Sequence, residues 1–196
     1  MSEKTVNLIL VGFGNVGKAF FQLLGEKPER IRKQYGLDLN LRSIIEVEGG
    51  LFSISPIRQN DVPETSPAGL TQNPLWNPGL VLEAVLKEVD PGVLVECTPS
   101  NIKTGKPGLR HIRTALENGW HVATANKGPL AVDYKGLREK ARRNHLALKF
   151  SGAAAAALPT IDVGLYSLAG TEILAIEGIL NKRWGRFSLR TVPKSC

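Results

Sequence analysis

Residues 6–11 form a short run of mostly branched apolar side chains, and a glycine closes it. This pattern is typical of a strand buried on both faces, as in a parallel sheet. Directly after it, residues 15–24 carry apolar side chains on one helical face, and Gly25 is placed to end that helix. A buried strand that passes through a glycine turn into a helix leaves few possible folds, because such units usually continue as parallel strands joined by crossover helices.

The alternation of strands and helices recurs as far as residue 150. We expect further strands at residues 41–47, 93–97, 121–125 and 146–150, and further helices at 80–89, 109–116 and 133–144, the last with Asp133 as its N-cap. Residues 26–40 are predicted to be a polar, exposed helical excursion, and the glycine- and proline-rich residues 49–79 a loop with one short strand. The pattern predicts a Rossmann-like α/β fold with a doubly wound parallel sheet.

The character of the sequence changes after Phe150. Residues 151–160 are mainly small, a helix is expected from Pro159 to about Leu168, and a strand is expected at 172–180. We therefore expect one domain over residues 1–150 and the beginning of a second, α+β domain from residue 151.

Charge and cysteine content narrow the classes of partner. The formal charge is +7, but residues 182–196 contain five basic residues and no acidic one, which leaves +2 on residues 1–181. A nucleic-acid site needs basic residues on the folded body, so we expect no nucleic acid. The first apolar run is too short for a signal sequence or a membrane span. Cys97 and Cys196 give neither a disulfide framework nor metal-ligand spacing, so we expect a soluble cytoplasmic protein without a metal.

The glycine turn matches the dinucleotide-binding pattern G-x-G-x-x-G. Its six residues are Gly12, Phe13, Gly14, Asn15, Val16 and Gly17. Between a strand and a helix, the first glycine makes the tight turn, the second lets the backbone approach a pyrophosphate, and the third allows close packing. The helix N-terminus then attracts the phosphates. The motif alone is weak, since a glycine turn can serve packing only, but this position favours NAD or NADP as cofactor.

The same pattern requires an acid at the end of the second strand, where it binds the ribose 2′-hydroxyl. Glu46 and Glu48 are candidates, beyond the usual spacing of ~20 residues because of the polar excursion. An acid there favours NAD, since it repels a 2′-phosphate, whereas Arg42 and Arg58 nearby could reverse that preference. The choice stays open at this point, and either glutamate could be a solvated charge.

Two further groups are expected at the edge of the sheet that holds the glycine turn. One strand leads into Thr98-Pro99-Ser100 and the next into Asn126-Lys127-Gly128-Pro129. Parallel strands end at one edge, where open α/β folds bind ligands, so Lys127 is expected to face the cofactor cleft. A lysine is often simply solvated. The Gly-Pro turn would fix its stem, however, and a cation there could polarise a carbonyl, hold a carboxylate or relay a proton.

Other reactive or aromatic residues have simpler interpretations. Cys97 is expected to be a buried strand residue rather than a nucleophile, since no histidine is placed near it. His111 is expected on the polar side of its helix, and the three histidines lack metal-ligand spacing. Trp76 and Trp120 are interpreted as packing residues.

Five stretches together resemble one family. In chain order they are ILVGFGNVGKAF, VECTPSN, ALENGWHVATANKGPLA, LPTIDVGLYSLAG and EILAIEGILN. Over about residues 5–181 the chain resembles the N-terminal part of homoserine dehydrogenase, and the ATANKGP block is much more specific than the glycine motif. Enzymes of this family interconvert aspartate 4-semialdehyde and homoserine with NAD or NADP, on the route to threonine, methionine and isoleucine.

The resemblance implies roles for the residues at the sheet edge. Gly12 to Gly17 would hold the pyrophosphate, Thr98 to Ser100 would lie along the nicotinamide, and Asn126 and Lys127 would approach nicotinamide and substrate. Lys127 would then be the active-site cation, ready for the alkoxide that develops in hydride transfer. Residues 1–150 would be the dinucleotide-binding domain and 151–181 part of a catalytic and dimerisation domain, which makes a homodimer in the full-length family.

The chain departs from the family at two places. Residues 151–157 stand where the family often has a glutamate and a glycine-rich loop associated with a bound monovalent cation. That ion would lack its carboxylate here, although backbone carbonyls could still bind it. After Asn181 the family continues into a sheet that carries an acidic residue and the proton-donating lysine. Here a basic tail, residues 182–196, follows instead. We expect a truncated or frame-shifted product, and a designed or natural minimal version is the alternative.

Two classes of function follow from this comparison. The chain is either an NAD(P)-dependent oxidoreductase of this family or a module that binds a nicotinamide dinucleotide without turnover. The second class follows from the missing segment, because losing the proton donor and the substrate pocket removes several separate contributions to the reaction rate. Another aldehyde or sugar oxidoreductase with a similar first domain is a third possibility, against which the lysine block argues. An apolar strand at 172–180 without a partner is expected to promote self-association.

Overall fold

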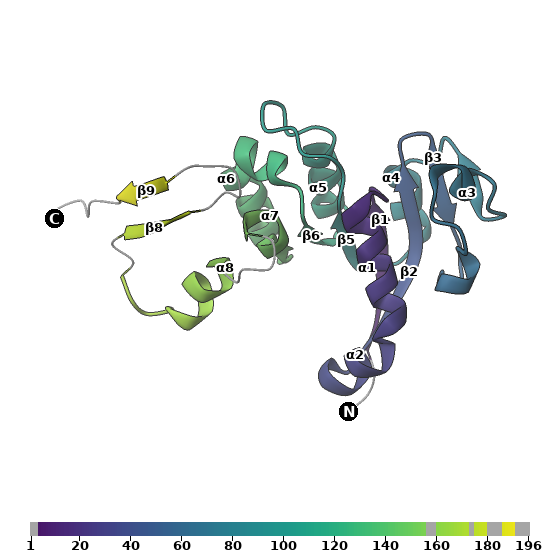
Figure 1. Ribbon diagram of the computed structural model, residues 1–196, viewed down its shortest axis with the longest axis horizontal. Helices are drawn as coiled ribbons and strands as arrows, with labels where there is room; N and C mark the ends of the chain where they lie inside the picture. Colours follow the sequence, from purple (N-terminus) through teal and green to yellow (C-terminus); the bar gives the residue numbers. More distant parts are fainter. Residues whose placement is uncertain (1–3, 156–159, 173–174, 180–185, 191–196) are drawn as a thin grey trace. The chain divides into compact units, whose positions relative to one another are not determined.

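The computed structural model describes residues 4–155, 160–172, 175–179 and 186–190. The chain divides into two compact units, Met1–Phe150 and Ser151–Cys196, drawn in Figure 1. That the first unit holds a dinucleotide and the second belongs to a catalytic and dimerisation domain stays a prediction.

The first unit is built on one seven-stranded sheet, in the order β4-β3-β2-β1-β5-β6-β7. Its strands are β1 (Lys4–Val11), β2 (Leu37–Glu46), β3 (Gly49–Phe52), β4 (Trp76–Pro78), β5 (Val93–Glu96), β6 (His121–Thr124) and β7 (Leu148–Lys149). Its helices are α1 (Asn15–Glu26), α2 (Pro28–Tyr35), the 3-10 turn η1 (Gln59–Asp61), α3 (Pro67–Thr71), α4 (Leu82–Glu88), α5 (Gly108–Glu117) and α6 (Lys127–Arg143).

The strand pairing is that of a Rossmann-like sheet with an antiparallel edge. β1 lies between β2 and β5 and pairs parallel with both, and β6 and β7 continue the parallel order. The predicted α/β fold class is therefore confirmed. β3 and β4 pair antiparallel beyond β2, in the segment where the sequence predicts a loop with one strand. These two strands are only four and three residues long, too short to show a period.

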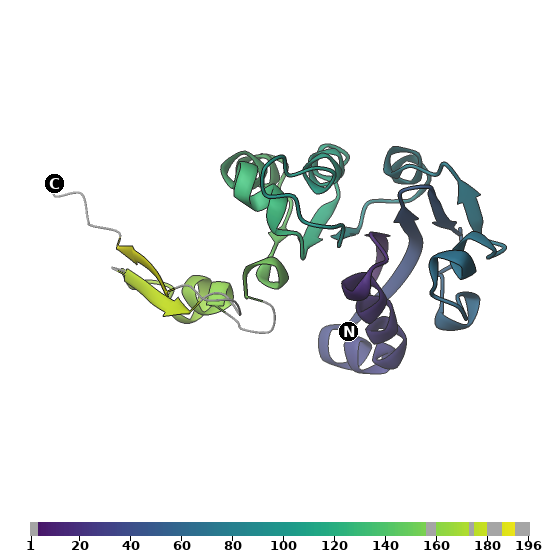
Figure 2. The same ribbon diagram turned by 45° about the horizontal axis from the view of Figure 1, so that its top comes forward.

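The sheet carries a hydrophobic core on each face, because side chains alternate along β1. Ile9 and Val11 pack with α4, α5 and α6 on one face. Leu8 and Leu10 pack on the other face, with Phe21 of α1. Figure 2 shows the purple helices α1 and α2 on one side of the strands and the teal and green helices α4 to α6 on the other. The doubly wound arrangement follows from this alternation.

Several boundaries differ from the predictions. α1 continues through Gly25 to Glu26, so Gly25 does not end the helix. β2 begins at Leu37, four residues earlier than expected, because it pairs with β1 from Lys4 onward. α6 begins at Lys127, so Gly128 and Pro129 lie in its first turn instead of forming a separate turn.

Asp133 still acts as a cap, but inside a longer helix. It has non-helical dihedral angles, φ −149° and ψ 49°, which kink α6. Its carboxylate accepts a hydrogen bond from the Gly136 amide at 3.1 Å and another from Arg113 at 2.6 Å. The second half of α6 therefore has the start that the sequence predicts.

The second unit contains α7 (Ser151–Ala155), α8 (Thr160–Asp162), the π-helical turn η2 (Val163–Ser167), β8 (Ala175–Ile179) and β9 (Arg186–Arg190). The Ser151 hydroxyl lies 3.1 Å from both carboxylate oxygens of Asp162. β8 pairs antiparallel with β9, so the strand expected at 172–180 has a partner in the basic tail, where the sequence predicts none. Pro159, the expected helix start, lies outside the described residues.

Candidate functional site

A cleft of about 980 Å³ opens where β1 and β5 end. β2 lies on one side of β1 and β5 on the other, so this is the point where the winding of the sheet reverses. Open α/β sheets bind their ligands at such a point, beyond the carboxyl ends of the strands. The volume is at the upper end of the range of ~300–1,000 Å³ usual for ligand pockets.

Most of the predicted site residues line this cleft. They are Gly12, Gly14, Asn15, Val16, Thr98, Pro99 and Ser100. Phe13 and Gly17 do not line it. The Phe13 ring is buried in the core and meets Phe21 edge-on, with ring centroids 5.7 Å apart. The expectation that the ends of β1 and β5 come together is therefore realised.

The glycine loop combines two tight contacts with one open position. Gly12 has φ +91°, and a Cβ there would lie 2.7 Å from the carbonyl carbon of Cys97. A Cβ at Gly17 would lie 2.1 Å from the Gly12 oxygen, so α1 packs closely against the turn. At Gly14 a Cβ would meet nothing within 4 Å. Gly14 is also the N-cap of α1, and no side chain caps that helix. The backbone amides at the start of α1 are thus open to an anion.

Glu46 is the acid that the structure brings to the glycine loop. It ends β2, lines the cleft, and its carboxylate accepts a hydrogen bond from the Phe13 amide. Glu48 is exposed in the turn that follows β2. Neither Arg42 nor Arg58 lines the cleft, and the Arg58 guanidinium instead donates to Asn40 at 3.2 Å.

A fully buried carboxylate, Glu96, organises the loop after β5. Its Oε1 accepts from the Thr98 amide at 3.1 Å and from the Thr98 hydroxyl. Its Oε2 accepts from the Thr124 hydroxyl at 3.3 Å. His111 Nδ1 lies 3.7 Å from Oε1. A buried carboxylate needs such donors, because an unpaired one is costly, and here they fix Thr98 at the cleft.

Asn126 connects this network to the next strand. Its Nδ2 donates to the Thr98 hydroxyl at 3.1 Å and to the Pro99 carbonyl at 3.4 Å. Its Oδ1 accepts from the Gly128 amide at 2.9 Å and so caps α6. The amide group of this buried side chain is thereby engaged within the protein, and its contact with a cofactor stays a prediction.

Lys127 is the first residue of α6. Its backbone amide donates to the Ser100 hydroxyl at 3.0 Å, which joins the ends of β5 and β6. The side chain is exposed and does not line the cleft. The structure therefore places Lys127 at the correct edge of the sheet, whereas its expected orientation toward a cofactor and its role stay predictions.

Two residues of the site, Glu96 and His111, were not predicted from the sequence. His111 is buried and lines the cleft, so the expected position on a polar helix side is wrong. Cys97 follows β5 and is half-buried, whereas a buried strand residue was expected. Burial, and then the charge of Glu96, raise the pKa of its thiol to about 11, so this thiol is a poor nucleophile at neutral pH. Trp120 is fully buried, which agrees with a packing role.

Comparison with known proteins identifies the family. Residues 12–151 match the NAD-binding domain of homoserine dehydrogenase. The chain belongs to the homoserine dehydrogenase family. A homoserine dehydrogenase of Methanocaldococcus jannaschii is 36% identical over 180 residues, which are 90% of this chain and 53% of that protein. An NAD(+)-dependent homoserine dehydrogenase of Pseudomonas canavaninivorans is 33% identical and is matched over 89% of this chain and 50% of that protein.

A solved structure shows the same relation. A hyperthermophilic archaeal homoserine dehydrogenase in complex with NADPH matches 82% of this chain and 48% of its own, with a TM-score of 0.68 and 27% identity. The chain thus spans about half the length of the homoserine dehydrogenases that it matches. The matched half carries the NAD-binding domain, which confirms the resemblance drawn from the sequence.

The open position at Gly14 fits the cofactor of homoserine dehydrogenases. A pyrophosphate binds to backbone amides that no side chain covers, and the start of α1 supplies such amides.

Among the residues that the structure describes, no group of three or more His, Cys, Asp or Glu could hold a metal. In the same residues no helix is both long and apolar enough to cross a membrane.

Proposed function

We propose that the first unit binds a nicotinamide dinucleotide in the cleft between the ends of β1 and β5. The open side of Gly14, at the uncapped start of α1, supports this most strongly, because it gives a diphosphate access to backbone amides. Gly12 to Gly17 would hold the diphosphate, and Thr98, Pro99 and Ser100 would lie along the nicotinamide.

NAD is the preferred form in this proposal. The Glu46 carboxylate lies at the glycine loop, where it would accept hydrogen bonds from ribose hydroxyls and repel a 2′-phosphate. The Pseudomonas relative is described as NAD(+)-dependent, and the archaeal enzyme was solved with NADPH, so both forms occur in the family. Calorimetry should give a lower Kd for NAD than for NADP. Glu46→Gln keeps an acceptor for the Phe13 amide and should reduce that difference, whereas a preference for NADP in the unmodified chain would contradict the proposal.

The reaction proposed for the protein is the interconversion of L-homoserine and L-aspartate 4-semialdehyde, on the route to threonine, methionine and isoleucine. A nicotinamide bound in the cleft would supply the hydride-transfer chemistry. Lys127 would hold positive charge near the substrate oxygen, and its place at the start of α6 adds the positive end of the helix dipole. Ser100 would keep that helix start against the end of β5, through its bond to the Lys127 amide.

A module that binds the dinucleotide without turnover is the second candidate, because the chain spans about half of its relatives. Homoserine-dependent reduction of NAD or NADP that is lost in Lys127→Ala and retained in Lys103→Ala, an exposed control, would support the enzyme. Binding in calorimetry with a blank activity assay would support the module. The absence of binding by folded protein would contradict both. A homodimer is proposed as the protein's assembly, as the resemblance to the family implies.

A further inference from the structure

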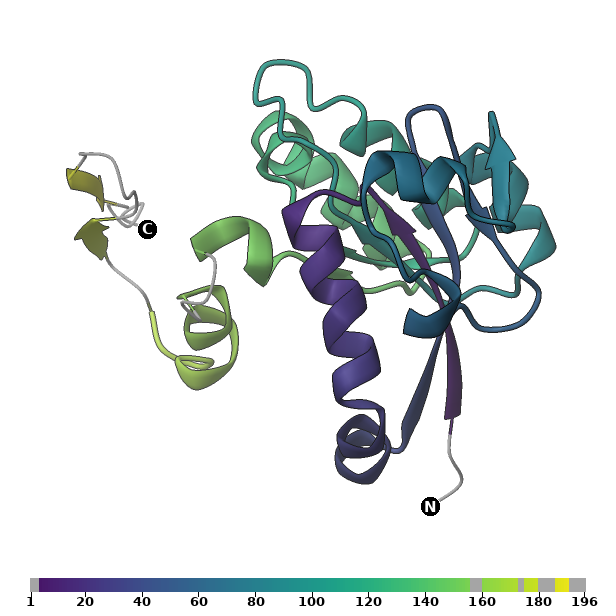
Figure 3. The same ribbon diagram turned by 45° about the vertical axis from the view of Figure 1, so that its right-hand side comes forward.

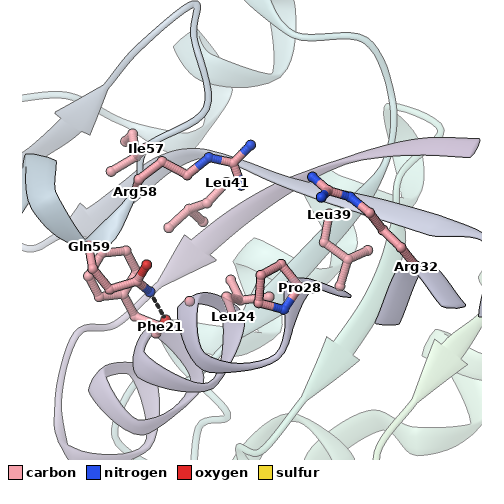
Figure 4. A pocket seen from close by; sticks show the side chains of 10 residues that line it. Phe21, Leu24, Pro28, Arg32, Leu39, Leu41, Ile57, Arg58 and Gln59 are labelled. Carbon is pink, nitrogen blue, oxygen red and sulfur yellow. Dashed lines mark hydrogen bonds between the residues drawn. The ribbon is translucent and has the colours of Figure 1, made fainter. Parts of the chain in front are cut away.

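A second cavity of about 320 Å³ lies in the first unit, at the far end of β2 from the cleft. It is formed by the C-terminal half of α1, by α2, by the first half of β2 and by residues 57–59, and Figure 4 shows it from close by. Figure 3 shows α2 near the amino ends of β1 and β2, at the opposite end of α1 from the glycine loop. The cavity shares no lining residue with the cleft, so the two are separate sites.

One wall of this groove is set by a close contact. The Gln59 side chain donates to the Phe21 carbonyl at 2.6 Å. A Cβ at Gly25 would lie 1.9 Å from the Gln59 side chain, so only glycine lets Gln59 reach that carbonyl. Glycine inside a helix is unfavourable, and here it admits the side chain that closes the groove. The cavity is therefore bounded by specific packing.

The interior is apolar and two guanidinium groups lie at its rim. Apolar surface comes from Phe21, Leu24, Leu39, Leu41 and Ile57. Arg32 and Arg58 line the same groove, and their guanidinium groups point toward one another above Leu39 and Leu41 in Figure 4. A groove with these two properties suits a molecule with a charged end and an apolar end.

The two arginines differ in what neutralises them. Arg32 donates to Asp38 at 3.1 and 2.8 Å and to Glu29 at 2.7 Å, so two carboxylates already surround it. Arg58 donates to Asn40, which carries no charge. None of the ion pairs found in the described part of the chain includes Arg58. Arg58 thus keeps its charge and most of its five N–H donors for another acceptor.

We propose that this groove binds a small monocarboxylate with an aliphatic body. The Arg58 guanidinium would take the carboxylate, because its planar fork matches two carboxylate oxygens. The aliphatic part would cover Leu24, Leu39 and Leu41. The volume is at the small end of the usual range for ligand pockets, which restricts the ligand to a short chain. The site is independent of the cofactor proposal.

A titration series followed by amide NMR tests this proposal. The probes are acetate, propionate, butyrate and hexanoate at constant ionic strength, with inorganic phosphate as an anion that has no apolar part. Saturable shifts are expected at Phe21, Leu24 and Leu39, and affinity should rise roughly three- to fourfold for each added methylene. Phosphate should give no saturable shift at these residues.

Two variants separate the site from general anion binding. Arg58 is exposed, so Arg58→Gln should fold normally and lower hexanoate affinity at least tenfold. The matched control is Arg138→Gln on the exposed side of α6, which should leave it unchanged. Absence of saturable shifts at the groove, affinity that does not depend on chain length, or equal affinity in Arg58→Gln would overturn the proposal. A parallel titration with NAD reports on the cleft separately.

Discussion

Replacement of Glu96 by alanine should destabilise the first unit by about 2–4 kcal/mol, from the loss of a buried hydrogen-bond acceptor and from the cavity that the side chain leaves. The side chain is fully buried and accepts from the amide and hydroxyl of Thr98 and from the hydroxyl of Thr124. The Thr124 hydroxyl has another acceptor, the Glu96 carbonyl at 3.3 Å, whereas the Thr98 amide would lose its partner. A buried donor without a partner costs about 1–3 kcal/mol, and the vacated space adds to this.

The assay is chemical denaturation followed by circular dichroism, with two companion variants. Glu96→Gln keeps an acceptor for Thr98 and should cost about 1–2 kcal/mol. Glu117→Ala is the matched control, because Glu117 pairs with Lys140 on the surface and its side chain is 54% exposed. An exposed ion pair contributes at most about 1 kcal/mol.

The reasoning would be refuted if Glu96→Ala and Glu117→Ala lowered the free energy of unfolding equally. Glu96→Ala also affects the cleft, because Thr98 lines the cleft and Glu96 holds Thr98 in place. Dinucleotide affinity should therefore fall in Glu96→Ala, although Glu96 itself lies beneath the site.

Three other predictions concern single residues. Gly17→Ala should lower the melting temperature by several degrees in a thermal scan, because its Cβ would lie 2.1 Å from the Gly12 oxygen. The Cys97 thiol, with its pKa raised from 9.0 to about 11, should react slowly with iodoacetamide at pH 8, as mass spectrometry of the labelled peptides would show. An unfolded chain loses that proton first, so stability should fall as pH rises from 9 toward 11, and Cys97→Ala should lack this fall. Asp133→Ala should cost about 1 kcal/mol in urea denaturation, because it removes the cap of the second half of α6.

The periodic spacing of apolar residues predicted the longer strands and helices of the first unit. The apolar run before Gly12 predicted β1, and the helical spacing after it predicted α1. A strand buried on both faces is apolar throughout, whereas a helix buried on one face has apolar residues every three to four positions. Similar patterns predicted β5, β6 and α5. The rule for parallel strands then predicted that β1, β5 and β6 end at the same edge of the sheet. β3 and β4 were not predicted individually, since strands of three or four residues are too short to show an alternation of apolar and polar side chains.

Residues whose place depends on a neighbouring element were less predictable. His111 precedes Ala115 by one helical turn and shares its buried face, so the helical spacing of α5 itself indicates a buried histidine. Glu96 ends a strand whose other residues are all apolar. An acidic residue at the end of a buried strand was the signal in the sequence that indicated a site residue. The orientation of Lys127 depended on where α6 starts, and the sequence placed that start at Asp133.

A calorimetric titration of Gly14→Val beside the unmodified chain tests the central claim most directly. Gly14 has φ −74° and ψ −162°, an extended conformation open to any residue, and a Cβ there meets nothing within 4 Å. The variant should therefore keep its unfolding midpoint but bind NAD at least tenfold more weakly, because its side chain would occupy the place of the diphosphate. Equal affinity in the variant, or no heat from either dinucleotide with the folded unmodified chain, would contradict the assignment of the cleft.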